Sequence, residues 1–162
     1  MFKITKKQDL AKKIKLFDVY APNIARKAQP GQFVIVRSAE RGERIPLTIA
    51  DYDRVNGTIT IIFQEVGRST MDLGLFGKGQ ALLDFVGPLG RPSQLEKFGR
   101  VICIGGGVGI APIYPIARAL YAADNHIITI LGAQNVESLF WEEKLREVSN
   151  EVFVTTDDGS YG

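Results

Sequence analysis

The chain has 162 residues, of which 45% are hydrophobic and 23% are charged, and its formal net charge at pH 7 is +2. These values describe a globular protein with room for one sizeable domain or two small ones, and they exclude a strongly basic nucleic-acid-binding protein. Cys103 is the only cysteine, which excludes an internal disulfide and a cysteine-rich metal site within these residues. The first residues lack the apolar segment of a secretory signal, so we expect a cytoplasmic protein.

The first hundred residues contain short alternating apolar segments separated by turns, a pattern typical of strands. Asn56-Gly57 is the clearest turn signal, because both central residues of a type I′ hairpin turn need a positive φ. Residues 67–74 indicate a turn that enters a short helix. Six strands at near-regular spacing predict a small antiparallel β-barrel. We expect these strands at residues 2–6, 14–20, 32–37, 44–51, 58–65 and 81–86.

From residue 99 onward the pattern changes to strand, helix, strand, helix, strand, which predicts a parallel sheet. We expect the strands at residues 101–104, 127–131 and 152–156, with the first one buried on both faces, and the second helix at residues 137–148. The boundary falls near residues 91–99. We therefore predict a barrel domain over residues 1–97 and an α/β domain over residues 98–162, incomplete at its C-terminus.

A glycine-rich turn connects the first of these strands to its helix. The five residues after Ile104 include four glycines. Pro112 and Pro115 are expected in the first turn of the helix, where the absence of a proline N–H costs little because those N–H groups have no partner within the helix. Free N–H groups and the positive end of the helix dipole suit a dinucleotide pyrophosphate. The spacing does not match Gly-x-Gly-x-x-Gly, so a tight turn without a ligand is the alternative. The glycines and prolines also break the uncharged residues 101–117 into two elements, so we predict no membrane span.

The order of a β-barrel followed by a doubly wound nucleotide domain resembles the ferredoxin–NADP reductase superfamily. Three segments, Arg44–Thr48, Gly67–Thr70 and Gly105–Pro112, are similar to the branch of the dihydroorotate dehydrogenase B electron-transfer subunit. That branch also holds the sulfide dehydrogenase β subunit and the small subunit of NADH-dependent ferredoxin:NADP oxidoreductase. The sequences of residues 31–33 and 157–162 also resemble those of this branch.

The resemblance implies an FAD site in the barrel domain. Arg44 would contact the FAD pyrophosphate, and the Thr48 hydroxyl would face the reactive N5 of the flavin as the catalytic group. Here the arginine stands four residues before the hydroxyl, whereas the widespread family pattern has three. A surface arginine is the alternative for Arg44, and an ordinary helix N-cap is the alternative for the second loop. The implied FAD-binding residues are Arg44, Pro46, Leu47, Thr48, Ile49, Gly67, Arg68, Ser69 and Thr70.

The resemblance also implies an NAD(P)H site in the α/β domain. Neither a carboxylate nor an arginine stands directly after the second strand, at Gly132–Asn135, so NAD and NADP both remain open. An acidic turn without a ligand is the alternative for residues 157–159. The implied nucleotide-binding residues are Gly105, Gly106, Gly107, Gly109, Ile110, Ala111, Pro112, Asp157, Asp158 and Gly159.

The implied function is a flavoprotein oxidoreductase subunit that moves electrons between NAD(P)H and an iron–sulfur carrier through FAD. Its partner would be a second catalytic subunit or a ferredoxin-type carrier in a hetero-oligomer. A [2Fe–2S] cluster is expected only from residues beyond 162, since four thiolates are needed and one cysteine is present. We therefore expect these residues alone to accept a hydride poorly, and the open side of the three-stranded sheet to be covered by a partner, a copy or further residues. A non-catalytic nucleotide-binding subunit with the same fold is the alternative.

Overall fold

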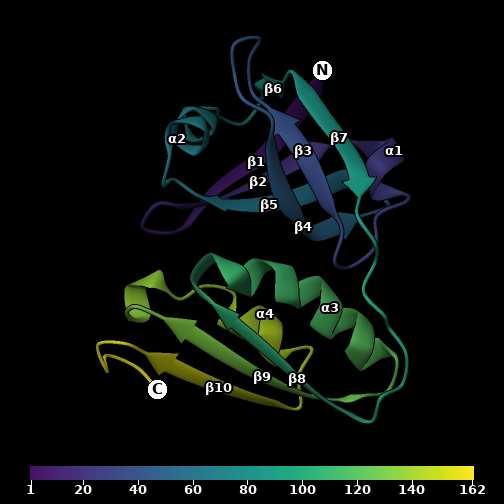
Figure 1. Cartoon of the computed structure of the whole chain (residues 1–162), viewed down its shortest axis with the longest axis vertical. Helices are drawn as coiled ribbons and strands as arrows, with labels where there is room; N and C mark the ends of the chain where they lie inside the picture. Colours follow the sequence, from purple (N-terminus) through teal and green to yellow (C-terminus); the bar gives the residue numbers. More distant parts are fainter. The chain divides into compact units, whose positions relative to one another are not determined.

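The computed structural model describes all residues 1–162, and they form two compact units, Met1–Pro92 and Ser93–Gly162 (Figure 1). The first unit is an antiparallel sheet in the order β6-β1-β2-β5-β4-β3-β7. Two short helices accompany it, α1 (Pro22–Ala25) and α2 (Arg68–Gly74). The strands are β1 (Phe2–Ala11), β2 (Ile14–Tyr20), β3 (Phe33–Arg37), β4 (Ile45–Asp53), β5 (Thr58–Gln64), β6 (Ala81–Leu82) and β7 (Asp84–Leu89).

An antiparallel barrel followed by a parallel sheet is confirmed, but the barrel has seven strands and not six. The expected last strand, residues 81–86, divides at Leu83, whose N–H donates to the carbonyl of Arg37 at 3.1 Å. Before this bend β6 pairs with β1, and after it β7 pairs with β3. The two ends of the sheet order are therefore consecutive in the chain, and this bend nearly closes the barrel.

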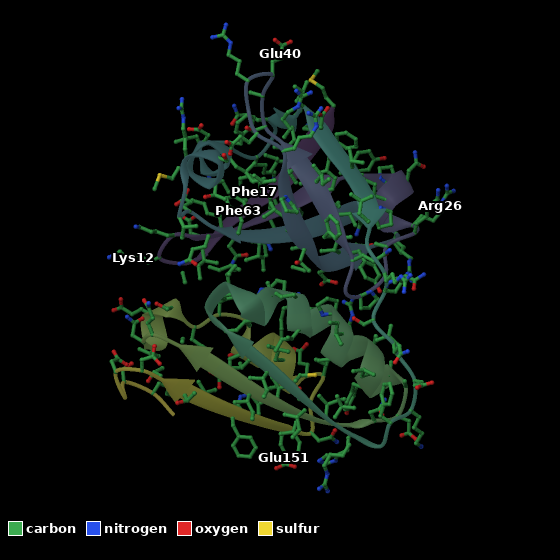
Figure 2. All side chains as sticks on the ribbon, viewed as in Figure 1. Lys12, Phe17, Arg26, Glu40, Phe63 and Glu151 are labelled. Carbon is green, nitrogen blue, oxygen red and sulfur yellow. The ribbon has the colours of Figure 1, made fainter.

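The core of the first unit is made of side chains that alternate inward along the strands. Phe17 and Phe63 meet edge to face with their ring centroids 5.1 Å apart (Figure 2). Leu73 of α2 is 1% exposed, so this helix buries its apolar side in the barrel core. The position of α2, and hence of the loop before it, is fixed by that burial.

The second unit contains a three-stranded parallel sheet in the order β10-β9-β8. Its longest helix, α3, has 13 residues, and no helix of the chain is long and apolar enough to cross a membrane. The elements are β8 (Arg100–Gly106), η1 (Gly107–Gly109), α3 (Ile110–Ala122), β9 (His126–Ala133), η2 (Val136–Ser138), α4 (Glu142–Arg146) and β10 (Glu151–Thr156).

The prediction of a single helix at residues 137–148 is wrong, because the structure has two short helical segments there, η2 and α4. Trp141 stands between them with φ of 59°, a left-handed conformation that ends regular helix hydrogen bonding. Its ring packs against Tyr114 of α3 at 5.2 Å, and the Lys144 ammonium lies 4.2 Å from the Trp141 ring centroid. Tertiary packing of this aromatic ring therefore overrides the local helical pattern.

Pro112 lies in the first turn of α3 as predicted, but Pro115 lies inside the helix, because α3 begins at Ile110. The prediction for β8 is also wrong, since the strand is buried on one face only. Ile102 and Ile104 are 56% and 68% exposed, and Phe153 of β10, which is 54% exposed, lies in the same row of the sheet as Ile104, with Ile130 of β9 between them. Both crossovers run in the same direction, from β8 to β9 to β10, so right-handed connections put α3 and α4 on the same face (Figure 1).

We expect the exposed sheet face to tolerate a charge. Ile104→Lys should change the free energy of unfolding of this chain by no more than about 0.5 kcal/mol, the usual range for surface positions. It should also lower the fluorescence of a dye that binds apolar surfaces. Denaturant unfolding and dye titration measure the two effects, and Ile127→Lys, at a fully buried position of β9, is the control that should unfold the unit. A large loss of stability in Ile104→Lys would contradict this description of the face.

Candidate nucleotide-binding sites

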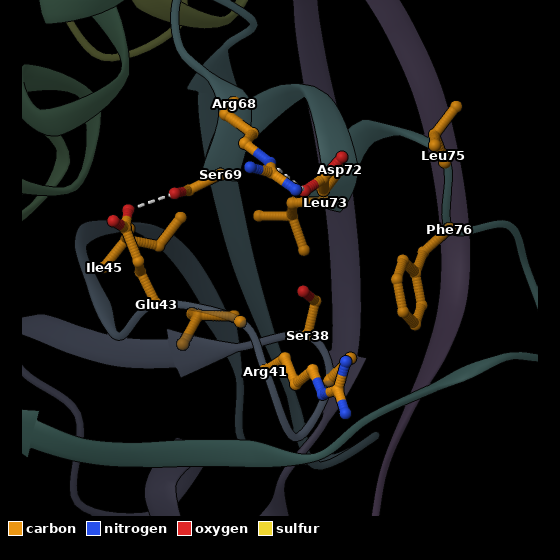
Figure 3. A pocket seen from close by; sticks show the side chains of 13 residues that line it. Ser38, Arg41, Glu43, Ile45, Arg68, Ser69, Asp72, Leu73, Leu75 and Phe76 are labelled. Atoms are coloured by element: carbon orange, nitrogen blue, oxygen red, sulfur yellow. Dashed lines mark hydrogen bonds and ion pairs between the residues drawn. The ribbon is translucent and has the colours of Figure 1, made fainter.

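A pocket of about 480 Å³ opens in the barrel unit between the end of β3, the loop before β4 and helix α2 (Figure 3). Its size lies within the range of small-molecule sites. Its walls combine apolar, hydroxyl and charged side chains. They are Val36, Ser38, Ala39, Arg41, Gly42, Glu43, Ile45, Arg68, Ser69, Asp72, Leu73, Leu75 and Phe76.

Two guanidinium groups supply positive charge at this pocket. Arg41 has no carboxylate within 4.0 Å, and Arg68 meets only Asp72, at 3.9 Å, with 95% of its side chain exposed. Both cations are therefore available to an anionic ligand, and a guanidinium binds phosphate in a bidentate manner. Ile45, Leu73 and Phe76 provide an apolar wall beside them.

The residues of the loop predicted to hold FAD phosphate, Gly67–Thr70, have two different roles in the structure. The Thr70 hydroxyl accepts the N–H of Gly67 at 3.2 Å and donates to the carbonyl of Gly67 at 2.9 Å. Thr70 therefore stabilises the start of α2, which is the capping role that was the alternative for this loop. Ser69 points to the pocket instead, where its hydroxyl donates to the Glu43 carboxylate (Figure 3). Arg68 and Ser69 are thus the two members of this loop that line the pocket.

The first predicted FAD segment lies beside the pocket. Strand β4 begins at Ile45, so Arg44 precedes the strand, and its guanidinium donates to Asp84 at 3.2 Å. Arg37 holds the same carboxylate at 2.7 Å. Thr48 is half-buried opposite Phe33, and its hydroxyl makes no hydrogen bond within the chain.

The remaining members of that segment form part of the barrel wall. Pro46 and Leu47 pair with Ile35 and Val34 of β3. The side chain of Ile49 is fully buried in the core, so only its backbone is available to a ligand. None of Pro46, Leu47, Thr48 and Ile49 lines the pocket.

In the second unit the structure brings the glycine turn and the acidic turn to the same edge of the sheet. The carboxyl ends of the three parallel strands lie side by side, with Gly106 opposite Gly132 and Thr156 opposite Ala133. The N–H of Asp157 donates to the carbonyl of Ala133 at 3.0 Å. Ligands of open α/β sheets bind outside this edge, so the predicted nucleotide residues are brought together where such a site belongs.

The glycines of this turn differ in whether the fold requires glycine at their positions. A Cβ on Gly105 would lie 3.0 Å from the carbonyl oxygen of Gly109 and 3.1 Å from Cα of Ile110, so Gly105 lets helix and strand pack closely. Gly107 has a φ of 53°, a backbone conformation that residues other than glycine rarely adopt. A Cβ on Gly109 would meet nothing within 4 Å, and its φ of −65° is ordinary. The fold therefore does not require glycine at 109, and the same is true at Gly106, where the nearest atom is 3.9 Å away.

The first turn of α3 offers backbone groups. Ile110 and Ala111 are 0% and 3% exposed, so their side chains belong to the core. Pro112 has no N–H to donate. The N–H groups at the cap that begins at Ile110 already donate to the carbonyls of Gly107 and Val108, so a ligand would have to share these donors.

Hydrogen bonds within the acidic turn favour the ionised form of Asp158. Hydrogen bonds from the side chain and the N–H of Ser160 lower the pKa of Asp158, because they stabilise its ionised form. Gly159, with φ of 70°, completes the turn. The Asn135 carboxamide accepts the N–H of Ser138 at 3.0 Å and caps η2, so it is engaged within the chain.

Sequence reasoning identified only Arg68 and Ser69 among the residues that line the barrel pocket, and Arg41, Glu43 and Phe76 are among those that it missed. Residues 40–43 carry only the pattern of a turn between strands. The signal that was available is the alternation of Glu40, Arg41 and Glu43 around Gly42, which places opposite charges in a short loop. Nothing in the pattern indicates that α2 would face that loop.

Several known proteins are similar to this chain. No family model matches the chain. It is 45% identical over 159 residues to the dihydroorotate dehydrogenase B (NAD(+)) electron transfer subunit homolog of Thermotoga maritima, covering 98% of this chain and 56% of that protein. It is 36% identical over 140 residues to the corresponding electron transfer subunit of Bacillus caldolyticus, covering 83% and 54%.

A solved structure gives the same result. The NADH-dependent reduced ferredoxin-NADP oxidoreductase structure superposes with a TM-score of 0.94 at 44% identity, covering 100% of this chain and 58% of that one. The chain thus spans slightly more than half the length of the proteins it matches. Over most or all of its length it is similar to the dihydroorotate dehydrogenase B electron-transfer subunits and to the NADH-dependent reduced ferredoxin-NADP oxidoreductase.

Proposed function

We propose that the chain is an oxidoreductase unit that moves electrons between a nicotinamide nucleotide and an iron–sulfur carrier through FAD. The observation that carries the proposal is the presence, in one chain, of a β-barrel pocket lined by two guanidinium groups and a glycine turn at the carboxyl edge of a parallel sheet. The relatives named for electron transfer and for NADH-dependent oxidoreduction support it. The reaction needs no side-chain nucleophile, because the cofactors supply the chemistry.

The barrel pocket fits part of an FAD molecule. Arg41, Arg68 and Ser69 offer the donors that a pyrophosphate needs, and Ile45 and Phe76 offer an apolar surface for a ring or ribose. Glu43 and Asp72 are the two carboxylates at the pocket that oppose an anion. Glu43 accepts the Ser69 hydroxyl, and Asp72 lies 3.9 Å from Arg68. Phosphate binding therefore requires that Ser69 exchange its carboxylate partner for the ligand.

The Arg44–Thr48 segment would hold the flavin end. The Thr48 hydroxyl is free to donate to the ring, and Arg44 can turn from Asp84 to the phosphate while Arg37 keeps the carboxylate paired. Bound FAD supplies the capacity to take two electrons as hydride and to release them singly. The chain's own residues bind and orient it. The thiolates of the iron–sulfur acceptor are not provided within residues 1–162, so the electrons leave these residues for a cluster held by residues beyond 162, by a partner subunit or by a carrier.

For the second unit we propose that the backbone at Gly105–Gly109 holds the nucleotide pyrophosphate and that NADH is preferred to NADPH. No Lys or Arg occurs in residues 132–138 or 155–162, whereas Asp157 and Asp158 stand next to the β9 end. A 2′-phosphate there would meet carboxylates and no cation. The relatives' NAD(+) names support the same preference.

The preference is testable with one substitution. Gln134→Arg is expected to strengthen NADPH binding about 10- to 100-fold, the effect of one charge-assisted hydrogen bond, and to leave NADH binding within about twofold. Tyr121→Arg, exposed at the far end of α3, adds the same charge away from the sheet edge and should change neither. Equilibrium binding of the two nucleotides measures both effects. Equal affinities in the unmodified chain would contradict the preference.

Flavin content and its reduction test the function itself. Purified protein is expected to be yellow and to lose its flavin absorption band on anaerobic addition of NADH. The non-catalytic alternative predicts colourless protein that still binds nucleotide.

A further inference from the structure

The loop that forms one wall of the barrel pocket is held at both of its ends by the same carboxylate. Arg37 is the last residue of β3 and Arg44 directly precedes β4, so the two arginines flank residues 38–43. The Arg37 Nε donates to Oδ2 of Asp84 at 2.7 Å, and the Arg44 Nη2 donates to the same oxygen at 3.2 Å. The pocket residues that this loop supplies are Ser38, Ala39, Arg41, Gly42 and Glu43.

Asp84 is itself fixed to the frame of the barrel. It is the first residue of β7 and stands opposite Arg37 in the pairing of β7 with β3. The residue before it, Leu83, makes the bend that nearly closes the barrel. The side chains of Arg37 and Asp84 are 22% and 27% exposed, and salt screens a partly buried pair less than a surface pair. The loop is therefore anchored to a fixed point of the fold.

The two arginines hold the loop in different ways. The Arg37 guanidinium also donates from Nη1 to the carbonyl of Glu40, inside the loop, at 3.4 Å. A planar guanidinium with several donors can hold a carboxylate and a carbonyl at the same time. Arg44 makes the longer contact and its side chain is 61% exposed, so it can turn to a ligand. Arg37 keeps the loop attached to Asp84 when Arg44 turns.

We propose that Asp84 is a positioning residue for the flavin pocket. Through Arg37 it holds residues 38–43 in the conformation in which the Glu43 carboxylate meets Ser69 of α2 and Arg41 lines the same pocket (Figure 3). Asp84 does not line the pocket, so it acts through the arginines and not on the ligand. A loop that is already ordered loses less freedom when a ligand binds. The proposal rests on the proposed binding of FAD in this pocket.

Asp84→Asn tests the proposal, because it keeps the shape of the side chain and removes its charge. FAD is expected to bind about tenfold more weakly to this variant, since the loop must then be ordered on binding. Trypsin should cut the ligand-free chain after Arg41 about tenfold faster, because proteolysis follows the population of the opened loop. Asp84→Glu restores the carboxylate and should recover most of both properties.

Two controls separate this role from a general loss of stability. Trypsin sites outside residues 38–44 should be cut in Asp84→Asn at the rate of the unmodified chain. Asp9→Asn removes the carboxylate of another ion pair of the barrel unit, formed with Lys15 at 2.7 Å, and should change FAD binding and cleavage less than about twofold. Equal acceleration at all trypsin sites would overturn the proposal, because Asp84 would then only stabilise the fold.

The same substitution in an Arg44→Ala background shows which arginine transmits the effect. Asp84→Asn is expected to weaken FAD binding about tenfold in this background as well, because the loop is held through Arg37. Loss of the effect would mean that Asp84 acts on Arg44 alone, and the proposed control of the loop would be wrong.

The cleavage measurement needs no ligand, so it is independent of the proposed function. Faster cleavage after Arg41 in the Asp84→Asn variant of a chain that binds no FAD would refute the proposed function and support the control of the loop by Asp84. Unchanged cleavage after Arg41, or unchanged FAD binding in Asp84→Asn when the unmodified chain binds FAD, would overturn the positioning role.

Discussion

Replacing Gly109 by alanine is expected to stabilise the second unit slightly while weakening its binding of NADH. Gly109 has an ordinary φ and open space where a Cβ would stand, so alanine should add about 0.4–1 kcal/mol to the free energy of unfolding. If the backbone at this position approaches a pyrophosphate, the methyl group displaces it. Loss of one hydrogen bond to a charged group is expected to raise the Kd for NADH roughly 10- to 150-fold.

Two neighbouring glycines serve as matched controls for this result. Gly105→Ala puts a Cβ against backbone atoms and should cost about 1–3 kcal/mol of stability. Gly107→Ala should cost about 1–2 kcal/mol, because its φ is positive. Both variants lose nucleotide binding for structural reasons. Only Gly109→Ala separates stability from binding, and unchanged NADH affinity in that variant would show that the turn does not contact the nucleotide.

Removing the pocket cations is expected to release FAD. Arg41→Ala and Arg68→Ala should each weaken FAD binding by about 1.5–3 kcal/mol, the range for a hydrogen bond to a charged partner. Neither change should alter stability by more than about 0.5 kcal/mol, since Arg41 has no ion pair and Arg68 is 95% exposed. Fluorescence titration with FAD and denaturant unfolding give the two numbers.

Arg44→Ala tests the arginine identified by resemblance. Asp84 remains paired with Arg37 at 2.7 Å in this variant, so the barrel should remain stable. A loss of FAD equal to that of the pocket variants would place Arg44 on the phosphate, whereas unchanged FAD binding would leave it as a partner of Asp84 alone. Arg26→Ala, on the α1 side of the barrel, is the control for a general charge effect. If the three test variants, Arg41→Ala, Arg68→Ala and Arg44→Ala, all bind FAD like the unmodified chain, the pocket is not the flavin site.

Local signals in the sequence were sufficient where neighbours along the chain determine the structure. Asn56-Gly57 lies in the turn between β4 and β5, and the run from Val101 to Gly109 forms a strand followed by a glycine turn. The type of the first turn was wrong, because only Gly57 has a positive φ, 67°, and a type I′ turn needs one at Asn56 as well. The failures involve distant partners. The division at Leu83 depends on β1 and β3, which pair with opposite sides of the bend. The left-handed Trp141 depends on the ring of Tyr114.

The two candidate sites also differ in how far they could be predicted from local sequence. The glycine turn has a sequence signature because its requirements are local, as the positive φ of Gly107 shows. The barrel pocket has none, because Arg41 from one loop and Arg68 from α2 meet only after the core side of α2 is buried. The exposure of Ile102 and Ile104 likewise follows from the direction of two crossovers, which an apolar strand pattern does not encode.

Anaerobic titration of the FAD-loaded 162-residue chain with NADH tests the central claim most directly. The flavin absorption band is expected to bleach slowly but completely, and more slowly still in Gly109→Ala, whose FAD content should equal that of the unmodified chain. Failure to retain FAD, or retained FAD that NADH does not bleach, would contradict the assignment of electron transfer to this chain.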